Sequence, residues 1–97
     1  TGGTGFSERD VTPEATIEVC NRMANGIAEA IRNYSMTITP RAMFSRAVSG
    51  IRNNTVIINL PGSPKAVKES LEFLLPNLEH GLGILTNREN ECGAPSL

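Results

Sequence analysis

Apolar residues recur at intervals of three and four between Thr12 and about Asn33, which is the spacing of one buried face of an α-helix. The segment opens with Thr12 and Pro13; a threonine hydroxyl can cap free helical N–H groups, and proline suits the first turn. We therefore expect one helix from Thr12 to about Asn33, weakened at Gly26. Its buried stripe is formed by Ile17, Cys20, Ala24, Ile27 and Ile31.

The run TVIINL, residues 55–60, is apolar and rich in β-branched side chains, with Asn54 before it and Pro61 after it. A short run without polar alternation is typical of a strand that is buried on both faces. We therefore expect a central, parallel strand. The preceding segment 35–51 has no clear period, so we expect a loop with a short strand there, extended at Thr37–Thr39 and broken at Pro40.

A second helix is predicted directly after this strand. Ser63 can cap its first turn, and Pro64 can occupy the first helical position. Pro76 should bend or interrupt this helix before the segment 77–85. The apolar stripe of this helix consists of Val67, Leu71, Leu74 and Leu78.

Composition limits the range of functions. The 97 residues are 39% hydrophobic and 20% charged, without tryptophan and without a long apolar run, so we expect one globular domain that does not span a membrane. The formal net charge of -1 offers no broad basic surface for nucleic acid. Cys20 and Cys92 lie far apart and fit neither a zinc site nor a disulfide framework, which favours a reducing cytosol.

The glycine-rich start TGGTG is the first candidate site. A dinucleotide fingerprint would need a third glycine at Glu8, and a P-loop would need Lys followed by Ser or Thr where Phe6 and Ser7 stand, so both interpretations fail. A glycine turn, the carboxylate of Asp10 and the helix start at Thr12 can together bind a phosphate and a divalent cation. An ordinary turn that leads into a helix explains the same residues equally well.

The segment PGSPK, residues 61–65, is the second candidate. Backbone N–H groups at a helix start, the hydroxyl of Ser63 and the charge of Lys65 all suit an anion, although a simple helix cap also fits. Arg46 and Arg52 lie between the two candidates, and arginine suits bidentate phosphate contact. Surface arginines are common, so these two residues add little by themselves.

Three motifs in one order resemble the molybdopterin adenylyltransferase family, which includes Mog and MoaB-type proteins and the G domain of gephyrin. They are TGGTGFSERDVTPEAT, SRAVSGIR and TVIINLPGSPKAV, and the similarity covers residues 1–85. The resemblance implies a three-layer α/β/α domain with a mostly parallel sheet. The residues 86–97 that follow, TNRENECGAPSL, are polar, and we expect them to form a tail. The resemblance also implies a cytoplasmic homotrimer in molybdenum cofactor biosynthesis, which uses ATP and Mg²⁺ to adenylylate molybdopterin and releases pyrophosphate.

The resemblance also implies a set of site residues. Asp10 matches the catalytic acid that can hold Mg²⁺. The residues that match phosphate- or molybdopterin-binding positions are Gly2, Gly3, Thr4 and Gly5 in the first loop, Ser35, Ser45 and Arg46 near the pterin, and Asn59, Pro61, Gly62 and Ser63 in the second loop. We add Lys65 to this set because of its charge.

Members of this family carry about half a domain ahead of the TGG motif, with a second essential acid. We therefore expect this chain to be the C-terminal part of such a domain, with the N-terminal half missing. Two functions follow from this expectation. The chain either supplies one half of an adenylyltransferase site, or it is a non-catalytic molybdopterin-binding or scaffold module.

Overall fold

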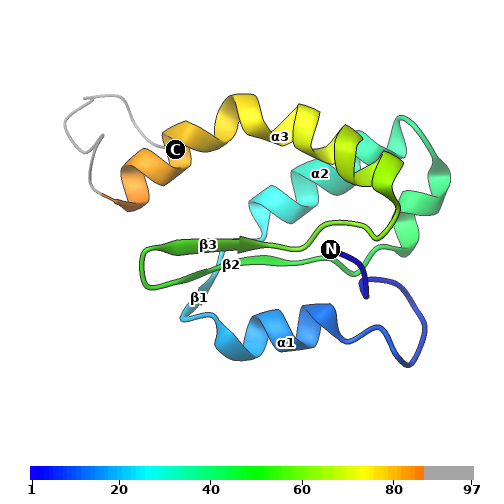
Figure 1. Ribbon diagram of the computed structural model, residues 1–97, viewed down its shortest axis with the longest axis horizontal. Coiled ribbons are helices and arrows are strands. Elements are labelled where there is room, and N and C mark those ends of the chain that lie inside the picture. The colour runs from blue at the N-terminus through cyan, green and yellow to red at the C-terminus, as the bar shows by residue number, and fades with distance from the viewer. Residues whose placement is uncertain (87–97) are drawn as a thin grey trace.

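The computed structural model describes residues 1–86, arranged as a small sheet between helices (Figure 1). Helix α1 covers one face of the sheet, and helices α2 and α3 lie on the other face. This arrangement gives the three α/β/α layers that the sequence predicts. In chain order the elements are α1 (Thr12–Val19), β1 (Arg22–Met23), α2 (Gly26–Met36), the 3₁₀-helix η1 (Pro40–Phe44), β2 (Ser49–Arg52), β3 (Thr55–Ile58) and α3 (Pro64–Leu85).

The single helix expected from residue 12 to residue 33 is wrong, because the structure has two helices with a short strand between them. Cys20 ends α1 in an extended conformation, with φ -83° and ψ 143°. Strand β2 supplies the hydrogen-bond partners that compete with helix continuation: Asn21 N donates to Ile51 O at 2.7 Å, and Ala24 N donates to the carbonyl of Ser49 at 2.9 Å. Gly26 is therefore the first residue of α2 and not a weak point inside one long helix.

The strand of the TVIINL run is neither parallel nor central among the described residues. The sheet order is β1-β2-β3, and both pairings are antiparallel. Only two residues, Asn53 and Asn54, join β2 to β3, and so short a connection can link antiparallel strands only. Asn53 adopts the left-handed conformation, with φ 54°, which asparagine tolerates better than most residues. The described part of the sheet is therefore antiparallel, not mostly parallel.

The predicted start of α3 is confirmed. The Ser63 hydroxyl accepts a hydrogen bond from Ala66 N, and Pro64 opens the helix. Of the two outcomes expected at Pro76, a bend or an interruption, the interruption does not occur: the helix continues to Leu85 and is arched along its length (Figure 1). Packing against α2 stabilises α3, although Pro76 has no backbone N–H group to donate within the helix.

The buried face of α3 differs from the predicted stripe. Leu74 is buried, but the other buried residues of the helix are Ser70 and Gly83, whereas Val67 and Leu71 are only half-buried. The stripe predicted between residues 12 and 33 is also only partly buried. Ile31, on α2, is buried, whereas Ile17, on α1, is exposed. The hydrophobic core is small and consists of Ala28, Ile31, Ala47 and Leu74.

The segment between α2 and β2 is a turn followed by η1. The extended segment expected at Thr37–Thr39 is wrong, because the amides of Ile38 and Thr39 turn back to the carbonyl of Ser35 at 2.9 Å each. The short strand expected in this region is present as β2. No helix in the part of the chain that the structure describes is long and apolar enough to cross a membrane. The polar tail, apart from Thr86, lies outside the described residues, as does Cys92.

Candidate functional site

The two candidate loops, which are residues 1–11 before α1 (the first loop) and residues 59–63 between β3 and α3 (the second loop), meet backbone to backbone. Gly2 N donates to Leu60 O at 3.0 Å, and a Cβ atom on Gly62 would lie 3.3 Å from the Cα atom of Gly2. Gly2 and Gly3 have φ angles of 77° and 68°, a region that only glycine enters freely. A Cβ atom on Gly3 would also lie 2.3 Å from Oγ1 of Thr12. The glycines of the first loop are therefore required by its conformation and by its close contacts.

A cavity of about 230 Å³ lies beside these loops. It is bounded by the first loop, α2, η1, the end of the β2–β3 hairpin and the start of α3. Five predicted site residues line it, although they come from four separate parts of the sequence: Thr4, Ser35, Ser45, Asn59 and Pro61.

Sequence reasoning missed several residues of this cavity. Arg32, Thr39, Arg41 and Glu69 also line it. Arg32 lies three positions before Ser35 on α2, so helical periodicity places the two on the same side and could have identified it. Both terminal nitrogens of its guanidinium donate to Ala47 O, at 3.2 and 3.3 Å, which fixes its head group at the cavity wall.

Asn59 joins three elements at the cavity. Its side-chain oxygen accepts from Val48 N at 3.1 Å, and its amide nitrogen donates to Oγ1 of Thr16 on α1 at 2.8 Å. Its backbone N–H donates to Val48 O at 3.0 Å. Asn59 is only 4% exposed, so these bonds satisfy an otherwise costly buried amide. The geometry gives Asn59 a structural task at the wall of the predicted site.

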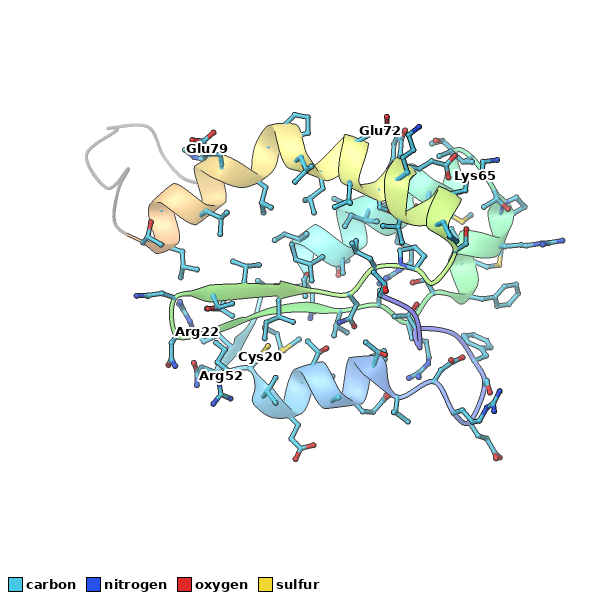
Figure 2. The ribbon with its side chains drawn as sticks, viewed as in Figure 1. Cys20, Arg22, Arg52, Lys65, Glu72 and Glu79 are labelled. Atoms are coloured by element: carbon cyan, nitrogen blue, oxygen red, sulfur yellow. The ribbon has the colours of Figure 1, made fainter. Side chains whose placement is uncertain are left out.

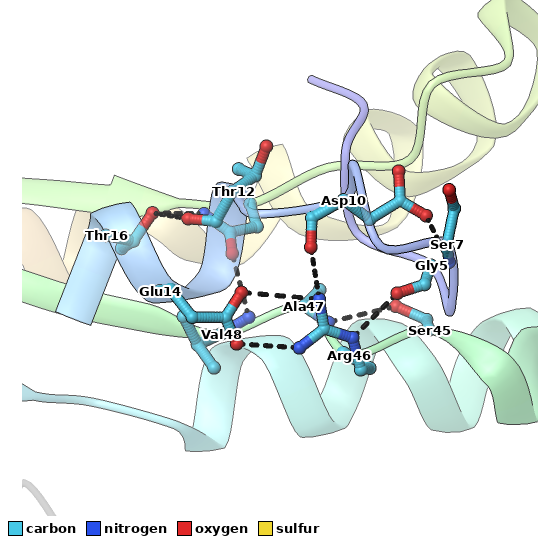
Figure 3. A network of polar contacts seen from close by, with 11 residues as sticks. Gly5, Ser7, Asp10, Thr12, Glu14, Thr16, Ser45, Arg46, Ala47 and Val48 are labelled. Carbon is cyan, nitrogen blue, oxygen red and sulfur yellow. Dashed lines mark hydrogen bonds and ion pairs between the residues drawn. The ribbon is translucent and has the colours of Figure 1, made fainter.

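Arg46 contacts the first loop instead of the cavity (Figure 3). Its Nε donates to Gly5 O at 2.6 Å, and its Nη2 donates to the carbonyl of Asp10 at 2.5 Å. Its Nη1 and Nη2 also donate to the carboxylate of Glu14, at 2.7 and 3.3 Å. The backbone N–H of Arg46 donates to Thr4 O at 2.7 Å. The resemblance implies that Arg46 lies near a ligand phosphate, and this stays a prediction.

The ion pair between Arg46 and Glu14 changes the protonation of both groups. The hydrogen bond from Arg46, helped by the charge of its guanidinium, lowers the pKa of Glu14 below its ordinary value of 4.5. The same hydrogen bond raises the pKa of Arg46. Both groups are therefore charged at neutral pH. The side chains are 34% and 58% exposed, so solvent screens much of their attraction.

Asp10 closes a tight turn in the first loop. Its Oδ2 accepts from Ser7 N at 3.0 Å, and its own N–H donates to Ser7 O at 2.9 Å. A Cβ atom on Gly5 would lie 2.9 Å from this Oδ2, so glycine there leaves room for the carboxylate. Within residues 1–86 no three His, Cys, Asp or Glu side chains gather closely enough to hold a metal ion.

The remaining predicted residues lie at the exposed start of α3. The Ser63 hydroxyl is used as the helix cap, as the simpler interpretation of PGSPK expects. Gly62 and Lys65 are exposed (Lys65 is labelled in Figure 2), and neither lines the cavity beside Thr4 and Asn59.

The fold and the site together define an α/β/α domain whose glycine loops meet beside a cavity. The family described as "Probable molybdopterin binding domain" matches residues 1–80, and the chain belongs to this family.

Individual relatives agree with this assignment. The chain is 50% identical to gephyrin of Dictyostelium discoideum over 88 residues, which are 91% of the chain and 12% of that protein. It is 46% identical to molybdopterin adenylyltransferase of Helicobacter pylori over 85 residues, 88% of the chain and 48% of that protein. The structure of the molybdopterin biosynthesis Mog protein of Mycobacterium ulcerans matches with a TM-score of 0.83 and 40% identity, covering 89% of the chain and 56% of that protein. The chain thus spans about half the length, or less, of these relatives.

Proposed function

We propose that this chain acts in molybdenum cofactor biosynthesis and contributes the molybdopterin-binding part of a molybdopterin adenylyltransferase site. The observation that carries the proposal is the cavity of about 230 Å³, which gathers Thr4, Ser35 and Asn59 beside the glycine loop. Residues from distant parts of the sequence converge there, as expected for a ligand pocket. The relatives named above supply the substrate class.

In the proposed reaction a phosphate oxygen of molybdopterin attacks the α-phosphorus of ATP. A new P–O bond forms, the bond between the α- and β-phosphates breaks, and pyrophosphate leaves. The first loop would supply backbone N–H groups to a phosphate, because its glycines let a ligand approach the backbone closely. The hydroxyls of Ser35 and Ser45 would orient the remainder of molybdopterin in the cavity, which both residues line.

Asp10 is the residue that would hold Mg²⁺ in this reaction. Its carboxylate belongs to a loop that fixed hydrogen bonds keep in one conformation. A magnesium ion bound there would reduce the repulsion between two anionic phosphates. One carboxylate from this chain is consistent with a magnesium site in which substrate phosphates provide several of the ligands.

The resemblance also supports two further proposals about the protein as a whole. We propose that it works in the cytoplasm and that it assembles as a homotrimer. Sedimentation equilibrium of the purified protein tests the second proposal, and a mass of one or two subunits would contradict it.

Titration of the purified protein with molybdopterin tests the proposed site. Ser35→Phe fills the cavity and should weaken binding at least about tenfold, or ~1.4 kcal/mol. Asn33→Phe is the matched control, because Asn33 is exposed on the same helix and does not line the cavity. No saturable binding by the parent protein, or equal effects of the two variants, would contradict the proposal. In a protein that carries the whole adenylyltransferase site, molybdopterin binding without pyrophosphate release from ATP and Mg²⁺ would favour the non-catalytic molybdopterin-binding or scaffold module.

A further inference from the structure

The first loop has few internal contacts that could keep it in one conformation. Phe6, Ser7, Glu8 and Arg9 are exposed, and the hydrogen bonds inside the loop are the pair between Ser7 and Asp10 and one weak bond from Arg9 N to the Ser7 hydroxyl at 3.3 Å. Its conformation therefore depends on contacts with the rest of the protein.

The guanidinium of Arg46 provides two of these contacts. The guanidinium donates to the carbonyls of Gly5 and Asp10, which lie at the two ends of the exposed part of the loop. The backbone N–H of Arg46 donates to the carbonyl of Thr4. A further contact is apolar, because the rings of Phe6 and Phe44 meet edge to face with their centroids 5.2 Å apart.

Glu14 fixes the orientation of this guanidinium. Its two carboxylate oxygens accept from Nη1 and Nη2, so the planar group is held along one edge while its other donors reach the loop (Figure 3). The bonds described above use four of the five N–H donors that an arginine side chain has. Glu14 lies in the first turn of α1, so Glu14 and Arg46 together connect the loop to this helix.

We propose that Glu14 is a positioning residue: through Arg46 it holds the loop from Gly5 to Asp10 in the conformation that receives the substrate phosphate. This proposal rests on the proposed function for the identity of the ligand. It differs from the direct phosphate contact expected for Arg46, because a guanidinium held by a carboxylate and two carbonyls acts on the loop.

Amide hydrogen exchange without ligand tests the positioning contact by itself. Glu14→Gln removes the charge and leaves only one oxygen to accept, so exchange at the amides of Asp10 and Arg46 should accelerate about two- to fivefold, the range for an exposed ion pair. Arg46→Lys cannot reach three acceptors and should accelerate the Asp10 amide at least as much. Glu18→Gln, one turn further along α1, is the matched control and should change neither amide. Unchanged exchange in Glu14→Gln would overturn the proposal.

Molybdopterin affinity then separates positioning from direct phosphate contact. If Glu14 positions the loop, Glu14→Gln lowers the affinity for molybdopterin, because a larger fraction of the loop is open and cannot bind. The factor by which the affinity falls is then no larger than the factor by which exchange accelerates. If Arg46 itself binds phosphate, removing the competing carboxylate raises the affinity, and that result would overturn the proposal. A parent protein that binds no molybdopterin would contradict the proposed function, whereas the exchange comparison would still decide whether Glu14 holds the loop.

Discussion

The hydroxyl of Ser49, on strand β2, accepts a hydrogen bond from the amide of Ala28 in the first turn of helix α2, over 3.0 Å. The same hydroxyl donates to Ala24 O at 2.6 Å. A residue of the sheet thus satisfies a helix N-terminus for which the neighbouring Asn25 provides no side-chain cap. One buried hydroxyl therefore connects the start of α2 to the sheet below it.

Ser49→Ala should lower the free energy of unfolding by about 1–3 kcal/mol, because it leaves a buried amide and a buried carbonyl without their partner. Ser49 is 0% exposed, so water cannot replace the lost hydroxyl. Urea denaturation followed by circular dichroism measures the change. Asn33→Ala, at an exposed position of α2, should change the stability by less than about 0.5 kcal/mol. Equal values for the two variants would show that the cap contributes nothing.

In a protein that carries the whole adenylyltransferase site, Asp10→Asn should reduce adenylyl transfer at least about 100-fold, or ~2.7 kcal/mol. Asparagine keeps an oxygen that can accept from Ser7 N, so the turn persists while the charge that would hold Mg²⁺ is lost. Molybdopterin binding should change little. Pyrophosphate release and molybdopterin titration measure the two effects, with Glu8→Gln in the same loop as control. Turnover within a few fold of the parent would remove Asp10 from the catalytic role.

Gly62→Val should weaken molybdopterin binding more than Lys65→Ala does. A Cβ atom at residue 62 would lie 3.3 Å from the Cα atom of Gly2, and the two branches of valine would push the first loop away. Lys65 is exposed, so the loss of its charge should change the affinity by less than about threefold. Titration of both variants with molybdopterin gives the comparison, and the reverse order would assign the anion contact to Lys65.

The contact between Glu14 and Arg46 should be lost at acidic pH and kept at neutral pH. The pKa of Glu14 is lowered in the folded protein, so the contact is fully formed above 4.5 and is lost as pH falls through the lowered pKa. The NMR shift of the Arg46 Nε–H group, recorded as pH falls from neutral, should show this step. The step should vanish in Glu14→Gln and persist in Glu18→Gln. A step that persists in Glu14→Gln would assign the titration to another group.

Local chemistry made some parts of this fold predictable. The start of α3 follows from Ser63 and Pro64 alone, because a cap needs only residues adjacent in the sequence. The break between α1 and α2 does not follow in this way. The segment from Cys20 to Ala24 leaves the helix to pair with Ile51 and Ser49, residues about thirty positions away, and periodicity contains no information about such partners.

In the candidate site too, features set by local sequence could be predicted, whereas contacts between distant residues could not. Glycine spacing was enough to predict the first loop, since φ angles of 77° and 68° at Gly2 and Gly3 require that residue type. The sequence did not predict that Arg46 binds the loop carbonyls and Glu14, and its expected contact with a phosphate stays a prediction. An arginine suits both kinds of acceptor equally, so only the three-dimensional arrangement identifies its partner.

Asn59 limits where this chain can tolerate added residues. Its side chain meets Val48 and Thr16 only because β3 has its present length and register after the turn. One residue inserted within β3 would send every later side chain of the strand to the opposite face and move Asn59 away from both partners. Insertions should therefore be tolerated between Arg52 and Thr55, where the chain is exposed, and should destroy the cavity when placed between Thr55 and Asn59.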